Sequence, residues 1–188
     1  MRCLRSPCLV ILLLTAFAAW GEVQEPFLEL SKGGLLKVVF SPDNSYIAVS
    51  TTMGIWLYDP ETLQEKDFIE AKGVGRTFDI SPGGSLIALA EDGRVRLWDV
   101  RRNKELRTLD LGEFSVNAIS YSPDGEHIAL SNYKDNTVSI WNVKTGEKEI
   151  GLPPFLKSVS CVLFSPDGRF LATSGLGDGR YTTYRAAL

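Results

Sequence analysis

The chain contains few of the residues from which catalytic and metal sites are most often built. Among its 188 residues there is one histidine, His127, and there are three cysteines. A histidine-rich metal site is excluded by this count, and a hydrolase triad finds no support in the rest of the sequence. We therefore expect no cofactor and no bound metal.

Cysteine is also scarce, and a chain that has lost its first residues, Cys3 and Cys8 included, cannot form an internal disulfide. Cys3 and Cys8 lie close to the N-terminus, which leaves Cys161 alone in the rest of the chain. Cys161 stands beside Val162 on a predicted inner strand. The expected role is that of a small buried apolar side chain rather than a reactive thiol.

No apolar run is long enough to cross a membrane, and the longest one indicates a leader. It covers residues 9–19, which is 11 residues, whereas a spanning helix needs about 17–25. Two arginines precede it, and patterns of two small residues around a third, suitable for cleavage, lie at its end, at 16–18 and 19–21. Residues 1–21 are therefore predicted to be a secretory signal peptide, and residues 22–188 to be periplasmic or extracellular. An uncleaved leader that anchors the chain in the membrane is the alternative.

The mature chain is weakly acidic. Removal of the leader takes away two arginines and no acidic residue, so 18 basic residues remain against 23 acidic ones, a net charge of −5. General nucleic-acid binding depends on a basic surface. We therefore expect protein partners, no nucleic acid, and no stable membrane span after cleavage.

One turn sequence recurs four times at nearly even spacing. It reads Ser-Pro, then Asp or Gly, then Asn or Gly, and it begins at Ser41, Ser81, Ser122 and Ser165. The intervals are 40, 41 and 43 residues, and a period of about 40–45 residues is typical of β-propeller blades. Proline fixes φ at the first central position, and Asp, Asn and Gly tolerate the conformation that follows. Each copy therefore predicts a β-hairpin.

Short apolar runs around each turn predict the strands of each repeat. One run rich in β-branched and aromatic residues precedes the turn, a second follows it, and a third and a more polar fourth come later. No amphipathic helical stretch of useful length occurs after residue 25. The predicted fold is all-β, a propeller of four-stranded antiparallel blades over residues 22–188, with three complete blades and a partial fourth. Their predicted bounds are about 36–69, 76–110, 116–151 and 158–185.

The strand count leaves two architectures open. The fourth repeat has three predicted strands, and residues 27–30 read as a spare strand before the first repeat. Propellers typically have about 4–8 blades. The chain therefore forms the first part of a larger propeller, or it closes as a small four-bladed ring that uses residues 27–30.

These repeats resemble the WD-repeat β-propeller family over about residues 27–185. The strongest motifs are Asp-Gly-Arg-Val-Arg-Leu-Trp-Asp-Val at 92–100 and Asp-Asn-Thr-Val-Ser-Ile-Trp-Asn-Val at 135–143. The family's Gly-His dipeptide is absent, so the histidine-centred hydrogen-bond network of its eukaryotic members cannot form. The resemblance implies a bacterial-type member whose blades rely more on apolar packing. Further departures from the family pattern are Tyr58, Asn142, Tyr184 and Arg185.

Residues that recur in each repeat are predicted to be structural. Trp98 and Trp141 are expected to pack between blades rather than to stack on a ligand. The aspartates of the turns are expected to bond their own backbone. His127 stands where the other repeats have Tyr, Leu or Phe, so a packing or edge role is expected. The residues assigned to structure by their recurrence are Asp43, Tyr58, Trp98, Asp99, Asp124, Trp141 and Asp167.

Residues that differ between repeats are better candidates for function. In the family, the loops from fourth to first strands and from second to third strands gather on one face. Exposed aromatic and arginine side chains are common hot spots of interfaces. The alternative is that these side chains merely cap the ends of the blades. The resemblance implies a partner-binding face that contains Leu35, Arg76, Phe114, Tyr133, Lys134, Phe155 and Lys157.

Together these features predict an exported scaffold that binds other proteins and has no catalysis of its own. WD-repeat proteins present a rigid face to other proteins, and the resemblance implies the same role. The alternative is the non-catalytic N-terminal part of a larger propeller enzyme or sensor, with an active domain beyond Leu188 or on another chain. The fold alone does not decide between them.

An open array of blades predicts that the mature chain associates. Residues 22–188 should elute as oligomers or aggregates, because an unpaired apolar blade face would remain in water. Size-exclusion chromatography with light scattering measures this. A compact monomer that unfolds cooperatively would contradict the open array and favour the closed ring.

Overall fold

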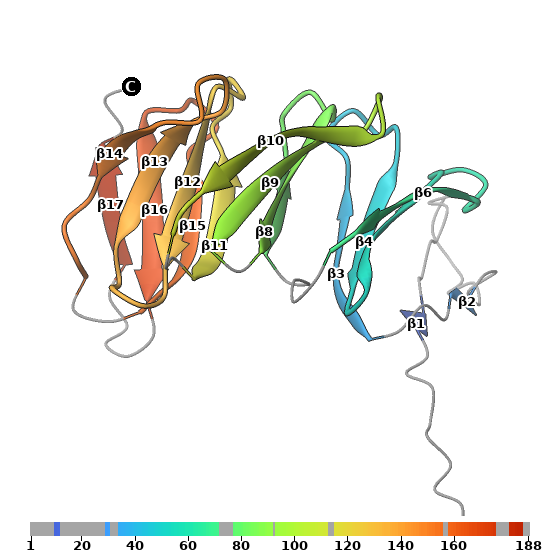
Figure 1. The fold of residues 1–188 in the computed structure, drawn as a ribbon, viewed down its shortest axis with the longest axis horizontal. Helices are drawn as coiled ribbons and strands as arrows, with labels where there is room; N and C mark the ends of the chain where they lie inside the picture. Colours follow the sequence, from blue (N-terminus) through green and yellow to red (C-terminus); the bar gives the residue numbers. More distant parts are fainter. Residues whose placement is uncertain are drawn as a thin grey trace, which may run out of the picture.

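Of the 188 residues, the computed structural model describes 10–11, 29–30, 34–71, 77–91, 93–112, 115–155, 158–175 and 181–185. Every regular element in these residues is a β-strand. Apart from one short pairing near the N-terminus, the strands form four antiparallel sheets that follow one another along an arc (Figure 1). No helix in the described part of the chain is long and apolar enough to cross a membrane.

The first three sheets have four strands each, and the fourth has three. The first sheet consists of β3 (Leu35–Phe40), β4 (Ile47–Thr51), β5 (Gly54–Tyr58) and β6 (Glu65–Glu70). The second consists of β7 (Phe78–Ile80), β8 (Leu86–Glu91), β9 (Arg94–Asp99) and β10 (Lys104–Asp110). The third consists of β11 (Val116–Tyr121), β12 (His127–Asn132), β13 (Val138–Asn142) and β14 (Lys148–Gly151). The fourth consists of β15 (Val159–Phe164), β16 (Phe170–Gly175) and β17 (Tyr181–Arg185).

This arrangement confirms the predicted fold class. Within each sheet the strands pair in chain order, so every connection is an antiparallel hairpin. Three sheets are complete four-stranded blades, and the fourth has the three strands that the repeat predicted.

The serine of the repeated turn explains why this sequence recurs. In all four turns the fourth residue donates its backbone N–H to the serine carbonyl, at 2.8–2.9 Å. The serine Oγ accepts a second bond from the N–H five residues on, at 2.9–3.0 Å, where the next strand begins. The fourth residue has a positive φ, which Asn and Gly adopt most readily. These residues are Asn44, Gly84, Gly125 and Gly168.

Side chains on the two faces of a sheet pack against different neighbours. On β8, Ile87 and Leu89 belong to the cluster shared with the first sheet, while Ala88 and Ala90 belong to the cluster shared with the third. All four are at most 5 % exposed. Successive side chains of a strand point to opposite faces, so the interior sheets are covered on both sides. Three such clusters join the four sheets in a row.

The two recurrent tryptophans lie at these contacts between sheets. Trp98 packs against the cluster between the first and second sheets, and Trp141 packs against the cluster between the second and third. Tyr58 holds the same repeat position in the first sheet, where it is 1 % exposed and packs with Ile47 and Val49. The large aromatic side chain near the end of the third strand therefore serves packing in each of these sheets.

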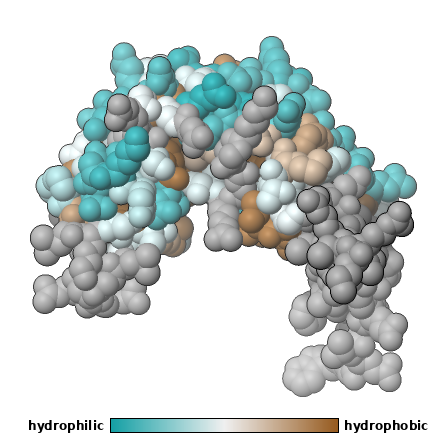
Figure 2. Space-filling model, turned by 60° about the horizontal axis from the view of Figure 1, so that its bottom comes forward, coloured by the Kyte–Doolittle hydropathy of each residue, from teal (hydrophilic) through white to brown (hydrophobic). Residues whose placement is uncertain are grey.

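In the described residues, the strands form an open arc in which β2 (Glu29–Leu30) does not pair with the last sheet. The closed four-bladed ring required residues 27–30 to complete that sheet, but β2 pairs with β1 (Val10–Ile11). In the described residues β17 pairs with β16 and is the edge strand of its sheet. Figure 2 shows the molecule hollowed between the two ends of the arc. Because β1 lies in the predicted leader, the closed ring stays the alternative for the mature chain.

Truncation of a side chain between two sheets tests this packing. Leu97 of β9 is fully buried in the cluster between the second and third sheets, so Leu97→Ala should lower the free energy of unfolding by about 2–5 kcal/mol. Leu106 of β10 is 51 % exposed, and the control Leu106→Ala should cost less than about 0.5 kcal/mol. Urea unfolding followed by tryptophan fluorescence measures both. Equal losses in the two variants would contradict the packing scheme.

Candidate functional site

The loops at one edge of the sheets contain the partner face proposed from the sequence. Backbone hydrogen bonds hold these loops together: Tyr133 N–H donates to the Ser115 carbonyl at 2.8 Å, and Phe155 N–H donates to the Asn136 carbonyl at 2.9 Å. Each bond joins the loop after a second strand to the loop before a first strand. Residues of this proposed face that lie outside the described residues are Arg76, Phe114 and Lys157.

The described residues of this edge differ in how exposed their side chains are. Tyr133 is 61 % exposed and Leu35 is 40 % exposed. Lys134 is exposed beside Tyr133. Phe155 is half-buried and packs against the cluster between the third and fourth sheets, so it caps the blades as the alternative expected.

Met53 belongs to the same edge, although sequence reasoning did not select it. It lies in the turn between β4 and β5 and is 53 % exposed. The sequence contained a signal for Met53, because the residue at this turn position differs in the other blades. We call Leu35, Met53, Tyr133 and Lys134 the loop face.

A hollow lies along the first strands of the sheets, on the inner side of the arc. Its volume is about 310 Å³, and residues of β3, β7, β11 and β15 line it. Lys37 Nζ donates to the Phe78 carbonyl at 2.7 Å and lies 4.5 Å from the centre of the Phe78 ring. Asn117 Nδ2 donates to the Val159 carbonyl at 2.9 Å. Polar side chains thus connect the first strands of neighbouring sheets.

The Asp79 carboxylate lies half-buried in the same wall. Its Oδ2 accepts a hydrogen bond from the backbone N–H of Tyr121, in the next sheet, at 2.8 Å. Burial raises the pKa of Asp79, against the opposing effects of the Tyr121 hydrogen bond and the charge of Lys37. Burial also lowers the pKa of Lys37, and the charge of Asp79 opposes that shift. Two opposite charges therefore act on each other across this wall.

Cys161 and His127 are the two single residues for which a chemical role was considered from the sequence. Cys161 is exposed and lines the inner hollow, so the expectation that it is buried is wrong. The alternation of β15 sends Val162 into the core instead, where it is 3 % exposed. The His127 side chain is 12 % exposed, and its Nε2 lies 3.0 Å from Glu149 Oε2 at the edge of the third sheet. Within the described ranges, no three His, Cys, Asp or Glu side chains gather as metal ligands would.

The aspartates of the repeats are engaged within their own turns. Asp124 Oδ1 accepts from the backbone N–H of Glu126 at 2.9 Å. A hydrogen bond from a nearby serine hydroxyl is the main cause that lowers the pKa of Asp43, Asp124 and Asp167. Asp99 is 4 % exposed, and the hydrogen bond from the Arg102 side chain lowers its pKa.

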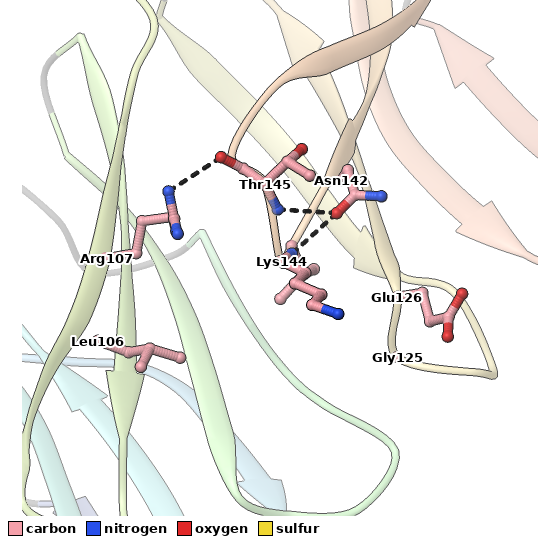
Figure 3. Close-up of a pocket in the computed structure, with 8 residues that line it drawn as sticks. Leu106, Arg107, Gly125, Glu126, Asn142, Lys144 and Thr145 are labelled. Carbon is pink, nitrogen blue, oxygen red and sulfur yellow. Dashed lines mark hydrogen bonds between the residues drawn. The ribbon is translucent and has the colours of Figure 1, made fainter.

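A larger groove lies between the second and third sheets, at the edge opposite the loop face (Figure 3). Its volume is about 560 Å³, and it is lined by Leu106 and Arg107 of β10 and by residues 125–126 and 142–145. Arg107 Nη1 donates to the Thr145 carbonyl at 2.9 Å and so bridges the two sheets. Sequence reasoning missed this groove, because its residues come from two blades and share no motif.

Two protein-family models match the chain. The model described as "WD domain, G-beta repeat" matches residues 70–99. The model described as "Eukaryotic translation initiation factor eIF2A" matches residues 85–178, which is 94 of the 188 residues. Together the matches span residues 70–178, which contain the second and third sheets and two strands of the fourth.

Curated relatives share shorter stretches with the chain. THO complex subunit 3 of Arabidopsis thaliana is 36 % identical over 93 residues, which are 47 % of this chain and 29 % of the relative. The small ribosomal subunit protein RACK1 of Candida albicans is 42 % identical over 66 residues, which are 35 % of this chain and 20 % of the relative. The matched segments thus span less than a third of the length of these relatives.

Solved structures share the fold over most of the chain. A structure of Kuenenia stuttgartiensis hydrazine synthase matches with a TM-score of 0.70 and 19 % identity, over 87 % of this chain and 48 % of that one. A chain of the mitotic checkpoint complex matches with a TM-score of 0.74 and 20 % identity, over 85 % of this chain and 52 % of that one. At this identity the likeness shows the fold alone.

The half-buried carboxylate of Asp79 predicts a specific pH dependence of stability. Because folding raises its pKa above the ordinary value of 3.8, the folded chain binds this proton more tightly than the unfolded chain. The stabilisation is complete below pH 3.8 and is lost as the pH rises through the raised pKa. The unfolding free energy of the wild type minus that of Asp79→Asn should therefore fall across this range, since the amide of the variant keeps an acceptor for the Tyr121 N–H. Urea unfolding at a series of pH values measures it, and a constant or rising difference would contradict the assignment.

Proposed function

The chain belongs to the WD-repeat family of β-propeller proteins and, over residues 85–178, to the family that the eIF2A model describes, and from this we propose that it is an exported protein-interaction scaffold. In this role it binds other proteins and carries out no catalysis of its own. The observation that carries the proposal is the loop face, where large side chains stand exposed on an edge fixed by packed sheets.

The loop face has the properties that a protein contact needs. Met53 and Tyr133 are more than half exposed, at 53 % and 61 %. Their loops are tied by backbone bonds such as Tyr133 N–H to the Ser115 carbonyl, so little ordering is required when a partner binds. Aromatic and methionine side chains are enriched at protein interfaces. A preorganised surface loses less conformational entropy when it binds.

Export is proposed from the first residues of the sequence. Two arginines, an apolar run of 11 residues and small residues after it fit a secretory leader. A partner of the scaffold would then be a periplasmic or extracellular protein. The net charge of −5 after removal of the leader favours a protein partner over a nucleic acid.

Two names among the matches support a second candidate, a partner from the translation machinery. One family model is described as a translation initiation factor, and one relative is a small ribosomal subunit protein. Cell fractionation separates the two candidates. An exported scaffold is recovered outside the cytoplasm without residues 1–21, whereas a translation partner would bring the full chain down with ribosomes.

Substitution of the loop face tests the scaffold role. The mature chain, immobilised and cross-linked in extract of the cells that produce it, should retain a protein that the double variant Met53→Ala/Tyr133→Ala retains about tenfold less. Quantitative mass spectrometry of the captured proteins measures this. Arg101→Ala is the control, because Arg101 is exposed at the opposite edge and should leave capture unchanged.

Two results of this experiment would count against the loop face as the binding surface. Equal capture by the wild type and the double variant would remove the loop face from the proposal. Equal loss in the double variant and in Arg101→Ala would indicate non-specific adhesion of the chain.

A further inference from the structure

The fourth strands of the first three sheets share one irregularity. In each of them one residue has no Cα partner on the neighbouring third strand, at the point where the register shifts. These residues are Lys66 in β6, Leu106 in β10 and Glu149 in β14. A bulge of this kind redirects the extra side chain, so the three positions are equivalent and can be compared.

In the first and third sheets the bulged side chain is charged and bonds within its own sheet. Lys66 Nζ donates to the Ser45 carbonyl at 2.9 Å and lies 3.4 Å from Asp59 Oδ2. Glu149 Oε1 accepts from Asn142 Nδ2 at 2.9 Å, and its Oε2 lies 3.0 Å from His127 Nε2. In these two sheets the bulged side chain therefore bonds to groups of its own sheet.

In the second sheet the same position is a leucine, and it remains exposed. Leu106 is 51 % exposed, whereas Leu109 on the same strand is 1 % exposed. Asp99, which corresponds to Asp59 of the first sheet, pairs with Arg102 at 2.7 Å instead of with the bulge. Figure 3 shows the Leu106 side chain extending from β10 toward the turns of the third sheet. An apolar side chain thus stands in the groove, where the other blades use a charge for internal bonding.

Two cations border this leucine. Arg107 reaches across the groove to the Thr145 carbonyl at 2.9 Å, and Lys144 is exposed in the same lining. In the part of the chain that the structure describes, neither forms an ion pair with a carboxylate. Glu126 is the acidic residue of the lining, and in Figure 3 its carboxylate points away from Leu106. The groove therefore combines an exposed aliphatic group with unpaired positive charge.

We propose that this groove binds a short segment of a partner protein in which an aliphatic side chain is flanked by aspartate or glutamate. The aliphatic side chain is buried against Leu106, and the acidic residues pair with Arg107 and Lys144. The groove volume of about 560 Å³ lies within the usual range of ligand sites, about 300–1,000 Å³. The inference rests on the proposed scaffold role, but it uses a surface opposite the loop face.

Fluorescence anisotropy with synthetic peptides tests the site. The probe is fluorescein-labelled Asp-Glu-Leu-Asp-Glu, and the mature chain should bind it about tenfold more tightly than Asp-Glu-Ser-Asp-Glu or Lys-Arg-Leu-Lys-Arg. Leu106→Ser should weaken binding of the probe about tenfold, and Lys144→Glu about fivefold. Added salt should weaken it further, since exposed ion pairs are screened.

Matched variants separate this site from the rest of the surface. Lys66→Ser changes the equivalent bulge of the first sheet, and Arg169→Glu reverses an exposed charge on the fourth sheet; both should bind the probe as the wild type does. Leu106→Ser, Lys144→Glu and Arg169→Glu should keep the wild-type unfolding midpoint in urea, because these side chains are exposed. Lys66→Ser loses the bond to the Ser45 carbonyl and should lower the midpoint slightly.

Three results would overturn the proposal. The first is equal binding of the leucine and serine peptides by the wild type. The second is undiminished binding of the probe by Leu106→Ser. The third is loss of probe binding in Met53→Ala/Tyr133→Ala with retention in Leu106→Ser, which would move the peptide to the loop face and leave the scaffold role intact.

Discussion

Apolar side chains on both faces of the sheets are the constraint on which the rest of the molecule depends. Ile87 and Leu89 of β8 face the preceding sheet, and Ala88 and Ala90 face the next one. A sheet of this kind needs a neighbour on each side to keep both faces out of water. The sheets therefore stack in a row, and the repeated apolar residues are buried between them. Only the sheet edges, the turns and the inner strands remain available for function.

Polar bonds between first strands complement this apolar packing. The sequence lacks the family's histidine-centred network, and we expected the blades to rely more on apolar packing. In the structure, Lys37 bonds the Phe78 carbonyl and Asp79 bonds the Tyr121 N–H, each across a boundary between sheets. Asn142 stands where the family has an aspartate, and its Oδ1 accepts hydrogen bonds from the backbone N–H groups of Lys144 and Thr145. At position 142 an asparagine therefore supplies the hydrogen-bond acceptor where the family has an aspartate.

The two candidate surfaces lie at opposite edges because of hairpin geometry. Connections from second to third strands reach one edge, and connections from first to second and third to fourth reach the other. The loop face occupies the first edge with Met53 and Tyr133, and the groove beside Leu106 occupies the second. The proposed scaffold role therefore allows one partner at each edge without competition. Both surfaces use residues that break the repeat, since repeated residues are already engaged in turns and packing.

The sequence by itself determined the all-β class, the four repeats, the hairpin at each Ser-Pro turn and the packing role of Trp98 and Trp141, because these depend on local turn chemistry and on periodicity. It also pointed to the edge that carries Tyr133. It predicted that Cys161 is buried, and this was wrong. The alternation of β15 turns Cys161 toward the inner hollow, where it is exposed. The tertiary structure alone decided the pairing of residues 29–30 and the groove beside Leu106. The physical reason is that a register shift of one residue and the meeting of two sheets join groups far apart in the chain, and no local pattern records them.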